Sequence, residues 1–528
     1  MSRPSRHDRI ELDVPLDEIG DPDALRRRVA RIAGMAPDAL PPLTVVRRAI
    51  DARGQRAVFH LVVGLGDTPL RTPDRPPLRE VSGEPVLIVG DGPAGLFCAH
   101  ELARAGIASM VIERGKTVQP RRHDLAAIQK RGEVDPDSNY CFGEGGAGTY
   151  SDGKLYTRAD KRGDPRDVLE TLAESGAPEE ILVDARPHIG SNKLPRVVTS
   201  MREALESVGV RFEMGARVVK LRIVGGSVRG VDLADGRTIE GRAVVLATGH
   251  SARDVFDMLL ALGVPLEPKG FALGVRIEHP QLLVNRAQYG RDAEHPLLPN
   301  AAYRLAEPTT IDARERGVFS FCMCPGGWIV PASTENDALV VNGMSLSRRD
   351  SPFANSGLVV AIEPDDWERA GFHGALGGVA LQRAIERASF EAGGGSMRAP
   401  ATRASDFLLR RTSQTLPDTS YIPGVTSAEI GSVLDVAGVP VAERIRSALR
   451  VFDRRLRGYA SSDAILVATE SRTSAPVRTP RDPVTLECAG LRRLYPCGEG
   501  AGYAGGIVSA ALDGIRVARA ITKELAQK

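Results

Sequence analysis

The stretch GDGPAG (residues 90–95) stands between a short apolar run, residues 86–89, and an amphipathic segment, residues 94–105. That order predicts a strand, a tight turn and a helix. The first glycine permits the turn, the second lets backbone approach a pyrophosphate, and the third lets the helix pack on the strand. A second apolar strand, residues 109–112, ends in Glu113, where an acid accepts hydrogen bonds from ribose hydroxyls. A glycine triplet alone also fits an ordinary loop, but all four features in register favour a dinucleotide site.

The composition indicates a soluble, multidomain, globular protein. A chain of 528 residues is too long for one compact core, so we expect two or three domains. Its hydrophobic content of 42% and charged content of 26% are typical of soluble proteins. A net charge of +2 gives no reason to expect a nucleic acid or an anionic membrane as partner.

Targeting signals and structural disulfides are not expected either. The polar, basic stretch at residues 1–9 is unlike a secretory signal, and no run of about 18 apolar residues predicts a membrane span. Six cysteines in so long a chain do not form a disulfide framework. The sequence therefore predicts a cytoplasmic protein that contacts no membrane.

Residues 10–64 predict a small N-terminal α+β unit, which a proline-rich and charged linker at residues 68–84 separates from the glycine turn. The apolar pattern indicates a strand, a helix and two further strands, the second pair joined at a hairpin. Such a unit corresponds to half of a ferredoxin-like fold. Its expected elements are residues 10–14, 21–33 with Asp21 as helix cap, 43–52 and 55–63.

A glycine-rich loop, residues 139–155, follows the second strand. Glycine weakens regular elements, so this many glycines indicate backbone that lies against a flat, charged ligand and donates amide hydrogens to it. Asp152 and Lys154 are expected at the edge of that ligand. A flexible surface loop is the alternative.

The next segments return to the same sheet. A helix is expected at residues 195–208, and residues 242–246 form a buried strand that closes on Thr248 and Gly249. His250, Ser251 and Arg253 lie just beyond its carboxyl end, where ligands bind in open α/β sheets. Further strands are expected at residues 211–214, 218–223 and 231–233.

Residues 255–485 show no second strand, glycine triplet and helix in succession. The region mixes strands, such as residues 338–341, with helices, such as residues 379–389. Turns that contain proline or glycine interrupt it at residues 325–327 and 392–395. We interpret it as an inserted substrate domain.

The end of the chain repeats the first pattern. Residues 494–496 lead into the stretch CGEGAGYAGG (residues 497–506) and then a helix at residues 507–525. A helix that begins at two glycines presents free amide donors and the positive end of its dipole. Such an end stabilises a phosphate or the anion on a reduced flavin, although a plain docking helix is the alternative.

Together these pieces resemble the FAD-binding fold of the glutathione-reductase superfamily, in the branch with one nucleotide domain and an inserted domain. The resemblance narrows to a bacterial group of FAD-dependent dehydrogenases, also described as NAD(P)/FAD-dependent oxidoreductases and largely uncharacterised. Four motifs carry it, and it extends approximately over residues 40–528: FGEGGAG with the following Lys154 (142–154), GHSARD (249–254), FCMCPGG (321–327) and 498–506.

The resemblance implies an α/β fold with a Rossmann-like, discontinuous FAD-binding domain, an inserted α+β domain and the N-terminal α+β unit. The expected boundaries are residues 1–80, 81–254, 255–485 and 486–528. It implies FAD as cofactor, with Glu113 at the adenosine ribose and Val218 at the adenine. The full set of expected FAD contacts is Gly90, Gly92, Pro93, Ala94, Gly95, Glu113, Arg114, Gly145, Gly146, Ala147, Gly148, Asp152, Lys154, Val218, Thr248, Gly249, Gly498, Glu499, Gly505, Gly506 and Ile507.

Candidate catalytic residues are fewer and more open to other interpretations. His250, Arg253 and Lys154 could act as general acids or anion clamps, but structural hydrogen bonds or FAD contacts fit them as well. Cys322 and Cys324, if they lie on a strand, would share one face and could form a redox dithiol. Buried cysteines that merely fill space are the favoured alternative for this pair, and no metal site is expected.

The predicted function is an FAD-dependent oxidoreductase that passes a hydride between flavin and an unidentified substrate. NAD(P)H is the candidate external electron donor. Two alternatives stay open: a flavin-dependent monooxygenase, and a flavoprotein that acts on or assembles with RNA or ribosomal particles through its N-terminal unit. The near-neutral charge argues mildly against the last. The sequence predicts neither the substrate nor the oligomeric state.

Overall fold

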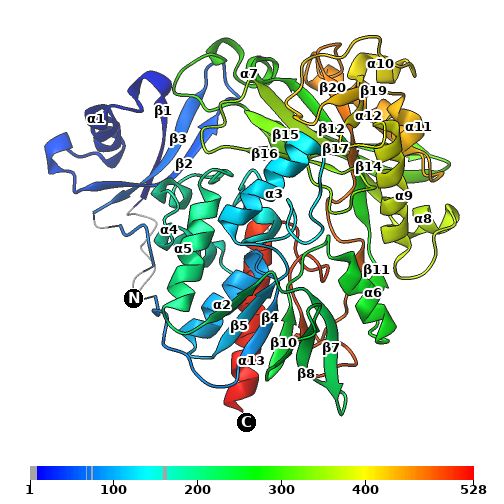
Figure 1. Cartoon of the computed structure of the whole chain (residues 1–528). Helices are drawn as coiled ribbons and strands as arrows, with labels where there is room; N and C mark the ends of the chain where they lie inside the picture. The colour runs from blue at the N-terminus through cyan, green and yellow to red at the C-terminus, as the bar shows by residue number, and fades with distance from the viewer. Residues whose placement is uncertain (1–8, 67, 73–74, 158–162, 528) are drawn as a thin grey trace.

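The computed structural model describes residues 9–66, 68–72, 75–157 and 163–527 (Figure 1). Its architecture is built around three sheets: one at the N-terminus, one all-parallel sheet, and one large mixed sheet. The all-parallel and mixed sheets lie at opposite ends of the main body in Figure 1, and the N-terminal unit stands to one side.

The N-terminal unit has the predicted order of elements: β1 (Arg9–Pro15), α1 (Pro22–Ala33), β2 (Leu43–Asp51) and β3 (Val58–Leu65). Strand β3 lies between the other two and is antiparallel to both. The Asp21 carboxylate caps α1 by accepting hydrogen bonds from the backbone N–H groups of Asp23 and Ala24, at 2.9 and 3.1 Å. The backbone of Arg48 bonds to the backbone at residues 183–185, which joins this unit to the main body.

The all-parallel sheet assembles strands from three distant parts of the chain, in the order β22-β10-β4-β5-β6. Strand β22 comes from the C-terminal stretch and pairs with β10, so the sheet is discontinuous in sequence as predicted. Because β10 also pairs with β4, the carboxyl ends of all three strands meet at one edge. The bounds are β4 (Val86–Val89), β5 (Ser109–Glu113), β6 (Arg211–Met214), β10 (Ala243–Leu246) and β22 (Leu494–Pro496).

Alternate side chains of β4 enter two different apolar layers. Val86 and Ile88 pack among helices, whereas Leu87 and Val89 pack against a small antiparallel sheet and α6 (Arg253–Ala261). Helices α2 (Pro93–Arg104) and α13 (Ile507–Ala526) approach closely at Gly514, where a Cβ would lie 2.1 Å from the Ala94 carbonyl oxygen. The helical layer contains these two helices together with α4 (Pro165–Glu174) and α5 (Leu194–Glu206), and the small sheet contains β7 (Val218–Val224), β8 (Ser227–Leu233) and β9 (Thr238–Glu240).

The mixed sheet has seven strands in the order β13-β14-β17-β12-β20-β18-β19. Its strands are β12 (Phe271–Pro280), β13 (Ala306–Ile311), β14 (Arg314–Cys324), β17 (Phe353–Ile362), β18 (Ala399–Arg403), β19 (Val425–Ser427) and β20 (Ile465–Glu470). Two short pairs complete the strands, β11 (Glu267–Pro268) with β21 (Val477–Arg478), and β15 (Gly327–Pro331) with β16 (Val341–Ser345). The remaining helices are α3 (Val118–Arg131), α7 (Gln281–Tyr289), α8 (Pro364–Arg369), α9 (Gly377–Ala392), α10 (Ala404–Leu408), α11 (Ile430–Leu434) and α12 (Val441–Arg455).

The prediction of a strand at residues 338–341 is wrong, except that residue 341 begins a strand. Ala338 to Val340 are buried but irregular, and the strand begins at Val341. The reason lies in their backbone hydrogen bonds: the N–H of Leu339 donates to the carbonyl of Glu386, and that of Val340 to the hydroxyl of Ser333. Apolar residues are therefore buried here without a strand partner.

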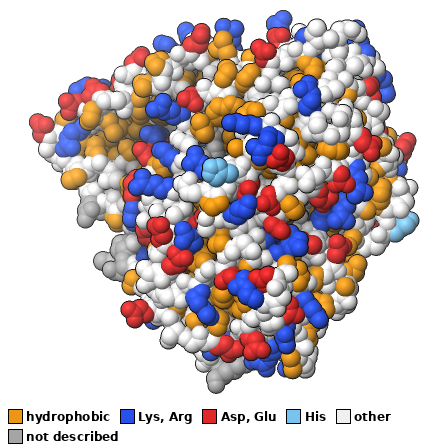
Figure 2. Space-filling model, viewed as in Figure 1, with side chains coloured by type: hydrophobic (Ala, Val, Ile, Leu, Met, Phe, Trp, Pro, Cys, Tyr) orange, Lys and Arg blue, Asp and Glu red, His pale blue; other side chains and the backbone are white. Residues whose placement is uncertain are grey.

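Charges of both signs are interspersed over the face shown in Figure 2, without a large area of one sign. Among the described residues, none of the helices combines the length and the apolar character that a membrane span requires.

Candidate active site

One cavity of about 350 Å³ lies between the all-parallel sheet and the mixed sheet. Three glycine-rich stretches border it: the turn after β4, the loop before residue 155, and the segment before α13. Val218 and Arg217 border it near one end, and Phe321 and Cys322 of β14 border it as well. The cavity thus brings together Val89 and Ala510, which are 421 positions apart in sequence. Its volume is within the size range of small-molecule sites.

The three glycines of the turn have different roles. A Cβ at Gly90 would lie 2.4 Å from the Ala247 carbonyl oxygen, and one at Gly95 would lie 1.9 Å from the Gly90 carbonyl oxygen. A Cβ at Gly92 would meet no protein atom nearer than the Cα of Gly146, at 3.9 Å. Gly90 and Gly95 are therefore required by the protein's own packing, whereas Gly92 leaves open space that a ligand can occupy.

Glu113 ties the turn to the glycine-rich loop. Its carboxylate accepts backbone hydrogen bonds from Asp91 and Gly143, at 2.9 and 2.8 Å, and from Gly115 at 2.9 Å. Glu113 also borders the cavity, as the sequence predicts, but its oxygens already hold three amide hydrogens in place. The side chain therefore shapes the site as well as facing it.

Arg121 organises the glycine-rich loop, and the sequence analysis missed it. Its fully buried guanidinium donates to the carbonyl oxygens of Asn139, Glu144 and Gly146, at 2.8–2.9 Å. One cation thus replaces the regular hydrogen bonds that this loop lacks. Nothing adjacent in sequence marks Arg121, because it comes from α3, more than 15 residues before the loop's first bonded carbonyl.

The C-terminal stretch meets the other two at close range. A Cβ at Gly500 would lie 2.4 Å from the Gly249 carbonyl oxygen, and one at Gly498 would lie 2.8 Å from the Ala94 Cβ. Gly505 and Gly506 have no other residue's atoms within 4 Å of a Cβ, and both border the cavity. Like Gly92, they face open space at the beginning of a helix, where backbone amides are available to a ligand.

Glu499 and His250, both at the cavity wall, have shifted pKa values. Burial raises the pKa of Glu499 to about 7. Burial, together with the nearby Arg472 and Arg253 cations, lowers the pKa of His250 to about 4. His250 also bonds through Nδ1 to the Ser251 hydroxyl at 3.1 Å, so a neutral imidazole borders the cavity at neutral pH.

Arg253 does not border the cavity. It lies at the start of α6 and pairs with the Glu386 carboxylate of α9 through two hydrogen bonds, at 2.7 and 2.9 Å. Arg472 binds the same carboxylate, and the two cations hold the pKa of Glu386 below its usual range although burial opposes this. Of the two interpretations left open for Arg253, this geometry favours the structural one, because the guanidinium is paired with a buried carboxylate. Arg472 borders the cavity, whereas Arg253 does not.

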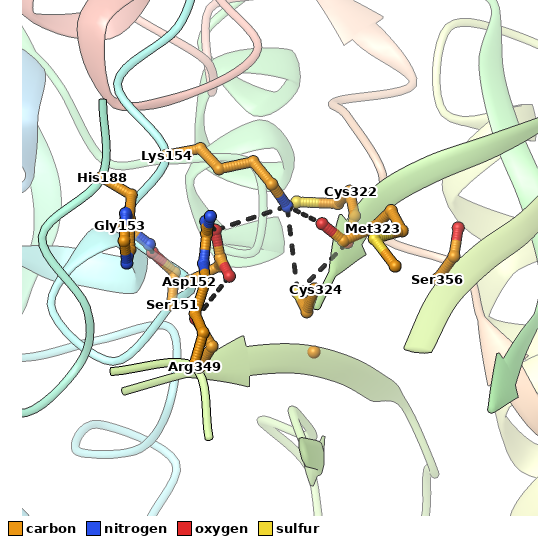
Figure 3. A network of polar contacts seen from close by, with 12 residues as sticks. Ser151, Asp152, Gly153, Lys154, His188, Cys322, Met323, Cys324, Arg349 and Ser356 are labelled. Carbon is orange, nitrogen blue, oxygen red and sulfur yellow. Dashed lines mark hydrogen bonds and ion pairs between the residues drawn. The ribbon is translucent and has the colours of Figure 1, made fainter. Parts of the chain in front are cut away.

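Asp152 and Lys154 lie in a charged network at the mixed-sheet end of the site (Figure 3). The Asp152 carboxylate accepts hydrogen bonds from Arg349 at 2.6 Å and from the Ser345 hydroxyl at 2.5 Å, and it lies 3.4 Å from the Lys154 ammonium. Lys154 in turn donates to the Met323 carbonyl. Burial disfavours both charges, but each raises the other's tendency to ionise: the pKa of Lys154 is raised and that of Asp152 is held below its usual range.

The two cysteines of β14 do not share one face of a regular strand. A bulge between Phe321 and Cys324 interrupts the register with β17, and Cys322 has a φ of 46°. Alternation with a period of two does not survive such a bulge. Cys322 is exposed and borders the cavity, whereas Cys324 is buried behind it, and both are free thiols.

The remaining predicted residues divide between the cavity wall and its support. His188 is not at the wall; its Nε2 lies 3.2 Å from the Ser347 carbonyl oxygen. Gly95, Gly145 and Gly498 also stand behind the wall, where a Cβ would lie 1.9, 2.0 and 2.8 Å from the nearest protein atom. At the wall are Gly90, Gly92, Pro93, Ala94, Glu113, Arg114, Gly146, Ala147, Gly148, Asp152, Lys154, Val218, Thr248, Gly249, His250, Cys322, Glu499, Gly505, Gly506 and Ile507.

Several residues at the wall carry no signal in the sequence analysis. Asn342 and Thr473 come from the inserted region, and nothing in their local pattern marks them, whereas Phe321 begins the FCMCPGG motif. Arg349 supports the wall by binding Asp152 across 197 positions of sequence. Only the tertiary fold brings these side chains to the site. No group of three or more His, Cys, Asp or Glu in the described part of the chain is arranged to hold a metal ion.

Comparison with known proteins agrees with this geometry. Family models match residues 84–128 ("FAD binding domain"), residues 193–304 ("FAD dependent oxidoreductase") and residues 270–473 ("FAD-dependent protein, C-terminal domain-like"). Residues 6–65 match a domain of unknown function. A relative from Clostridium beijerinckii, described as an uncharacterized protein, is 38% identical over 97% of this chain and 98% of its own length.

Solved structures that resemble the chain are distant. A flavin-dependent brominase, Bmp2, is 13% identical, with 84% of this chain and 81% of that chain covered and a TM-score of 0.37. Glycine oxidase from Geobacillus kaustophilus is 12% identical, with 83% and 95% covered and a TM-score of 0.34. L-proline dehydrogenase from P. horikoshii is 14% identical, with 85% and 95% covered and a TM-score of 0.32. At these values the likeness carries no argument about the reaction.

The residues present fit FAD, the cofactor that these family models name. Gly92, Gly505 and Gly506 leave space where a side chain would stand, and two helix N-termini supply the amide donors that a pyrophosphate requires. The cavity between the three glycine-rich stretches is continuous from Val218 to Cys322. The chain belongs to the family of FAD-dependent oxidoreductases, together with its uncharacterised relative from Clostridium, and its cofactor is FAD.

Proposed function

We propose that this oxidoreductase passes a hydride between FAD and a small-molecule substrate that enters at the mixed-sheet end of the cavity. The observation that carries the proposal is the composition of the cavity wall. One end is glycine and backbone, and the other brings Lys154, Phe321, Cys322 and Asn342 to the same space. A site that only bound the nucleotide part of a cofactor would not require charged, aromatic and sulfur-bearing side chains at its other end.

The glycine end suits the nucleotide part of FAD. The open space above Gly92 lets a pyrophosphate approach the N-terminus of α2, where the first amide groups of the helix have no partner within it. Glu113 faces the same region, and Val218 borders the cavity where the adenine is expected. Gly95 and Gly498 support this arrangement from behind the wall, and Gly90 supports it at the wall itself.

The other end suits redox chemistry. FAD supplies the hydride acceptor or donor when it is bound, and the protein supplies charge and orientation. Lys154 holds a positive charge there, because Asp152 keeps its ammonium protonated. The N-terminus of α13, at Gly506 and Ile507, adds the positive end of a helix dipole beside the same cavity. Both features stabilise negative charge on a reduced cofactor.

The fold is better suited to an electron donor that acts from solution than to a donor held by a second nucleotide-binding domain. The sheet that contains β4 is the only one in the described ranges whose strand pairs are all parallel, and its glycine turn is assigned to FAD. NAD(P)H would therefore act from solution at the open end of the cavity. In this proposal residues 255–485 form the substrate domain, and residues 81–254 and 486–528 form the FAD domain.

Anaerobic mixing of the purified holoprotein with NADH or NADPH tests the proposal. We expect the visible flavin absorption to bleach without oxygen and to return when an electron acceptor is added. Flavin that neither bleaches with a nicotinamide nor is reduced by any candidate substrate would contradict it. Rapid reoxidation by oxygen that hydroxylates a bound compound would instead favour the flavin-dependent monooxygenase.

A further inference from the structure

The end of β14 carries two cysteines in an unusual local structure. Phe321 pairs with Gly357 and Cys324 pairs with Asn355, so three steps along β14 oppose two along β17. The extra residue leaves Cys322 and Met323 outside the ladder. This bulge lies directly against the cavity, because both Phe321 and Cys322 border it.

Cys322 is held in a conformation that L-residues rarely adopt. Its φ of 46° lies in the left-handed region, where a residue other than glycine is strained. The surrounding side chains maintain that strain: the Arg276 guanidinium donates to the Cys322 carbonyl oxygen at 3.1 Å, and Lys154 donates to the next carbonyl, that of Met323. The result is an exposed sulfur at the wall of the cavity.

Cys324 lies behind Cys322 and differs from it in exposure to solvent. It is buried, and its thiol donates a hydrogen bond to the Cys322 carbonyl oxygen at 3.2 Å. Burial raises the pKa of Cys324 to about 12, although the Lys154 ammonium, 4.0 Å from the sulfur, acts in the opposite direction. Figure 3 shows the Lys154 amine between Asp152 on one side and the two cysteines on the other.

This arrangement separates an accessible thiol from a protected one. The exposed sulfur can reach a substrate, whereas the buried one stays protonated until its neighbour has reacted. Two cations, Lys154 and Arg276, face the pair and can stabilise a thiolate as it forms. Cysteines that only fill space need neither the exposure of Cys322 nor its strained backbone.

We propose that Cys322 and Cys324 are a redox-active thiol pair through which this enzyme reduces a disulfide substrate. The Cys322 thiolate attacks one sulfur of the substrate disulfide, a mixed disulfide forms, and the first substrate thiol leaves. Cys324 then gives up its proton and attacks the Cys322 sulfur, so the second substrate thiol leaves and a Cys322–Cys324 disulfide remains. Two electrons and two protons have moved from the pair to the substrate.

The return of the pair to the dithiol rests on the function proposed above. The Cys322–Cys324 disulfide takes two electrons from reduced FAD and two protons, and the nicotinamide donor supplies the next pair of electrons. Lys154 is suited to hold a proton beside the buried sulfur, since its ammonium lies 4.0 Å away. This proposal differs from the favoured sequence interpretation, in which these cysteines are inert.

Counting released thiols tests the proposal on the FAD-loaded protein. The probe is an aromatic disulfide that liberates coloured thionitrobenzoate, used in a Cys141→Ser background because Cys141 is the other cysteine that is not buried. We expect the intact pair to release two thionitrobenzoates for each chain and to retain none. Cys324→Ser should release one and hold the other at Cys322, and Cys322→Ser should release none. Cys324→Ala gives the same readout if the serine variant does not fold.

A second measurement connects the pair to the cofactor. After oxidation with diamide, anaerobic reductive titration should consume four electrons for each chain in the protein with both cysteines and two in Cys322→Ser. Retention of a mixed disulfide at Cys322 in the intact pair, or equal electron uptake by both proteins, would overturn the inference. Flavin absorption is recorded in every sample, so a protein that carries no FAD contradicts the proposed function, whereas FAD-loaded protein without pair chemistry contradicts this inference alone.

Discussion

The two ends of the cavity are lined by different kinds of chemical group. Around Gly92 the wall is backbone, and its one acidic side chain, Glu113, is bonded to three amide groups. Around Lys154 the wall is made of charged and sulfur-bearing side chains that come from the glycine-rich loop and from β14 of the mixed sheet. The difference indicates that one end recognises a constant ligand by shape and amide donors, whereas the other is adapted to a reaction.

A methyl group at Gly95 should destabilise the protein more than any of the substitutions below. In Gly95→Ala the new Cβ would lie 1.9 Å from the Gly90 carbonyl oxygen and 3.2 Å from a methyl of Ile88. Backbone cannot yield as a side chain does, so we expect a loss of more than about 3 kcal/mol and little folded protein. Expression yield and the urea midpoint measure it, with Gly54→Ala, in an open hairpin, as the matched control. A midpoint equal to that of the control would refute the close packing.

Removing the charge of Asp152 should have the next largest effect, at the reactive end. Asp152→Asn keeps the shape but leaves Arg349 and Lys154 without a countercharge, at a cost on the order of 3 kcal/mol. The pKa of Asp152 is depressed in the folded protein from its usual 3.8, so its contribution is present above that pH and is lost as the pH falls below about 4. Urea midpoints at neutral and acid pH measure this. If the urea midpoints of wild type and variant differ as much in acid as at neutral pH, the charge of Asp152 is not the source of the stabilisation.

A methyl group at Gly92 should weaken FAD binding without lowering the stability of the folded protein. Its Cβ would meet no protein atom within 3.9 Å, so the nucleotide-free protein should unfold at the wild-type urea concentration. FAD should bind at least about tenfold more weakly, equivalent to about 1.4 kcal/mol, because the methyl occupies the space of the pyrophosphate. Flavin content after gel filtration measures it. Full flavin content in Gly92→Ala would mean that the cofactor lies elsewhere.

The smallest effect is expected for a substitution that lies away from the cavity, in the N-terminal unit. Asp21→Ala removes the cap of α1 and two backbone hydrogen bonds, at a cost of about 1 kcal/mol. Since Asp21 belongs to the N-terminal unit, flavin content and cysteine reactivity should not change. Circular dichroism during urea unfolding measures the loss, and Asp23→Ala, whose carboxylate makes no capping bond, is the control. A loss of flavin in Asp21→Ala would show that the N-terminal unit supports the cofactor site.

The sequence predicts the backbone end of the site better than the side-chain end, for a physical reason. Strand, turn and helix around Gly92 are local, so glycine spacing and apolar periodicity predict them, and the same holds for the helix after Gly506. Arg253 and the cysteine pair show the limit: the first is taken up by Glu386, and the second lies on a bulge. Neither a distant carboxylate nor an extra residue in a ladder is visible in local pattern.

A crystal structure of the FAD-loaded protein tests the central claim most directly. The account predicts the pyrophosphate beside Gly92 and Gly146, the adenine near Val218, and the isoalloxazine ring in contact with the region of Lys154 and Cys322. FAD bound in the opposite direction, or at a site that does not touch both Gly92 and Gly506, would contradict it.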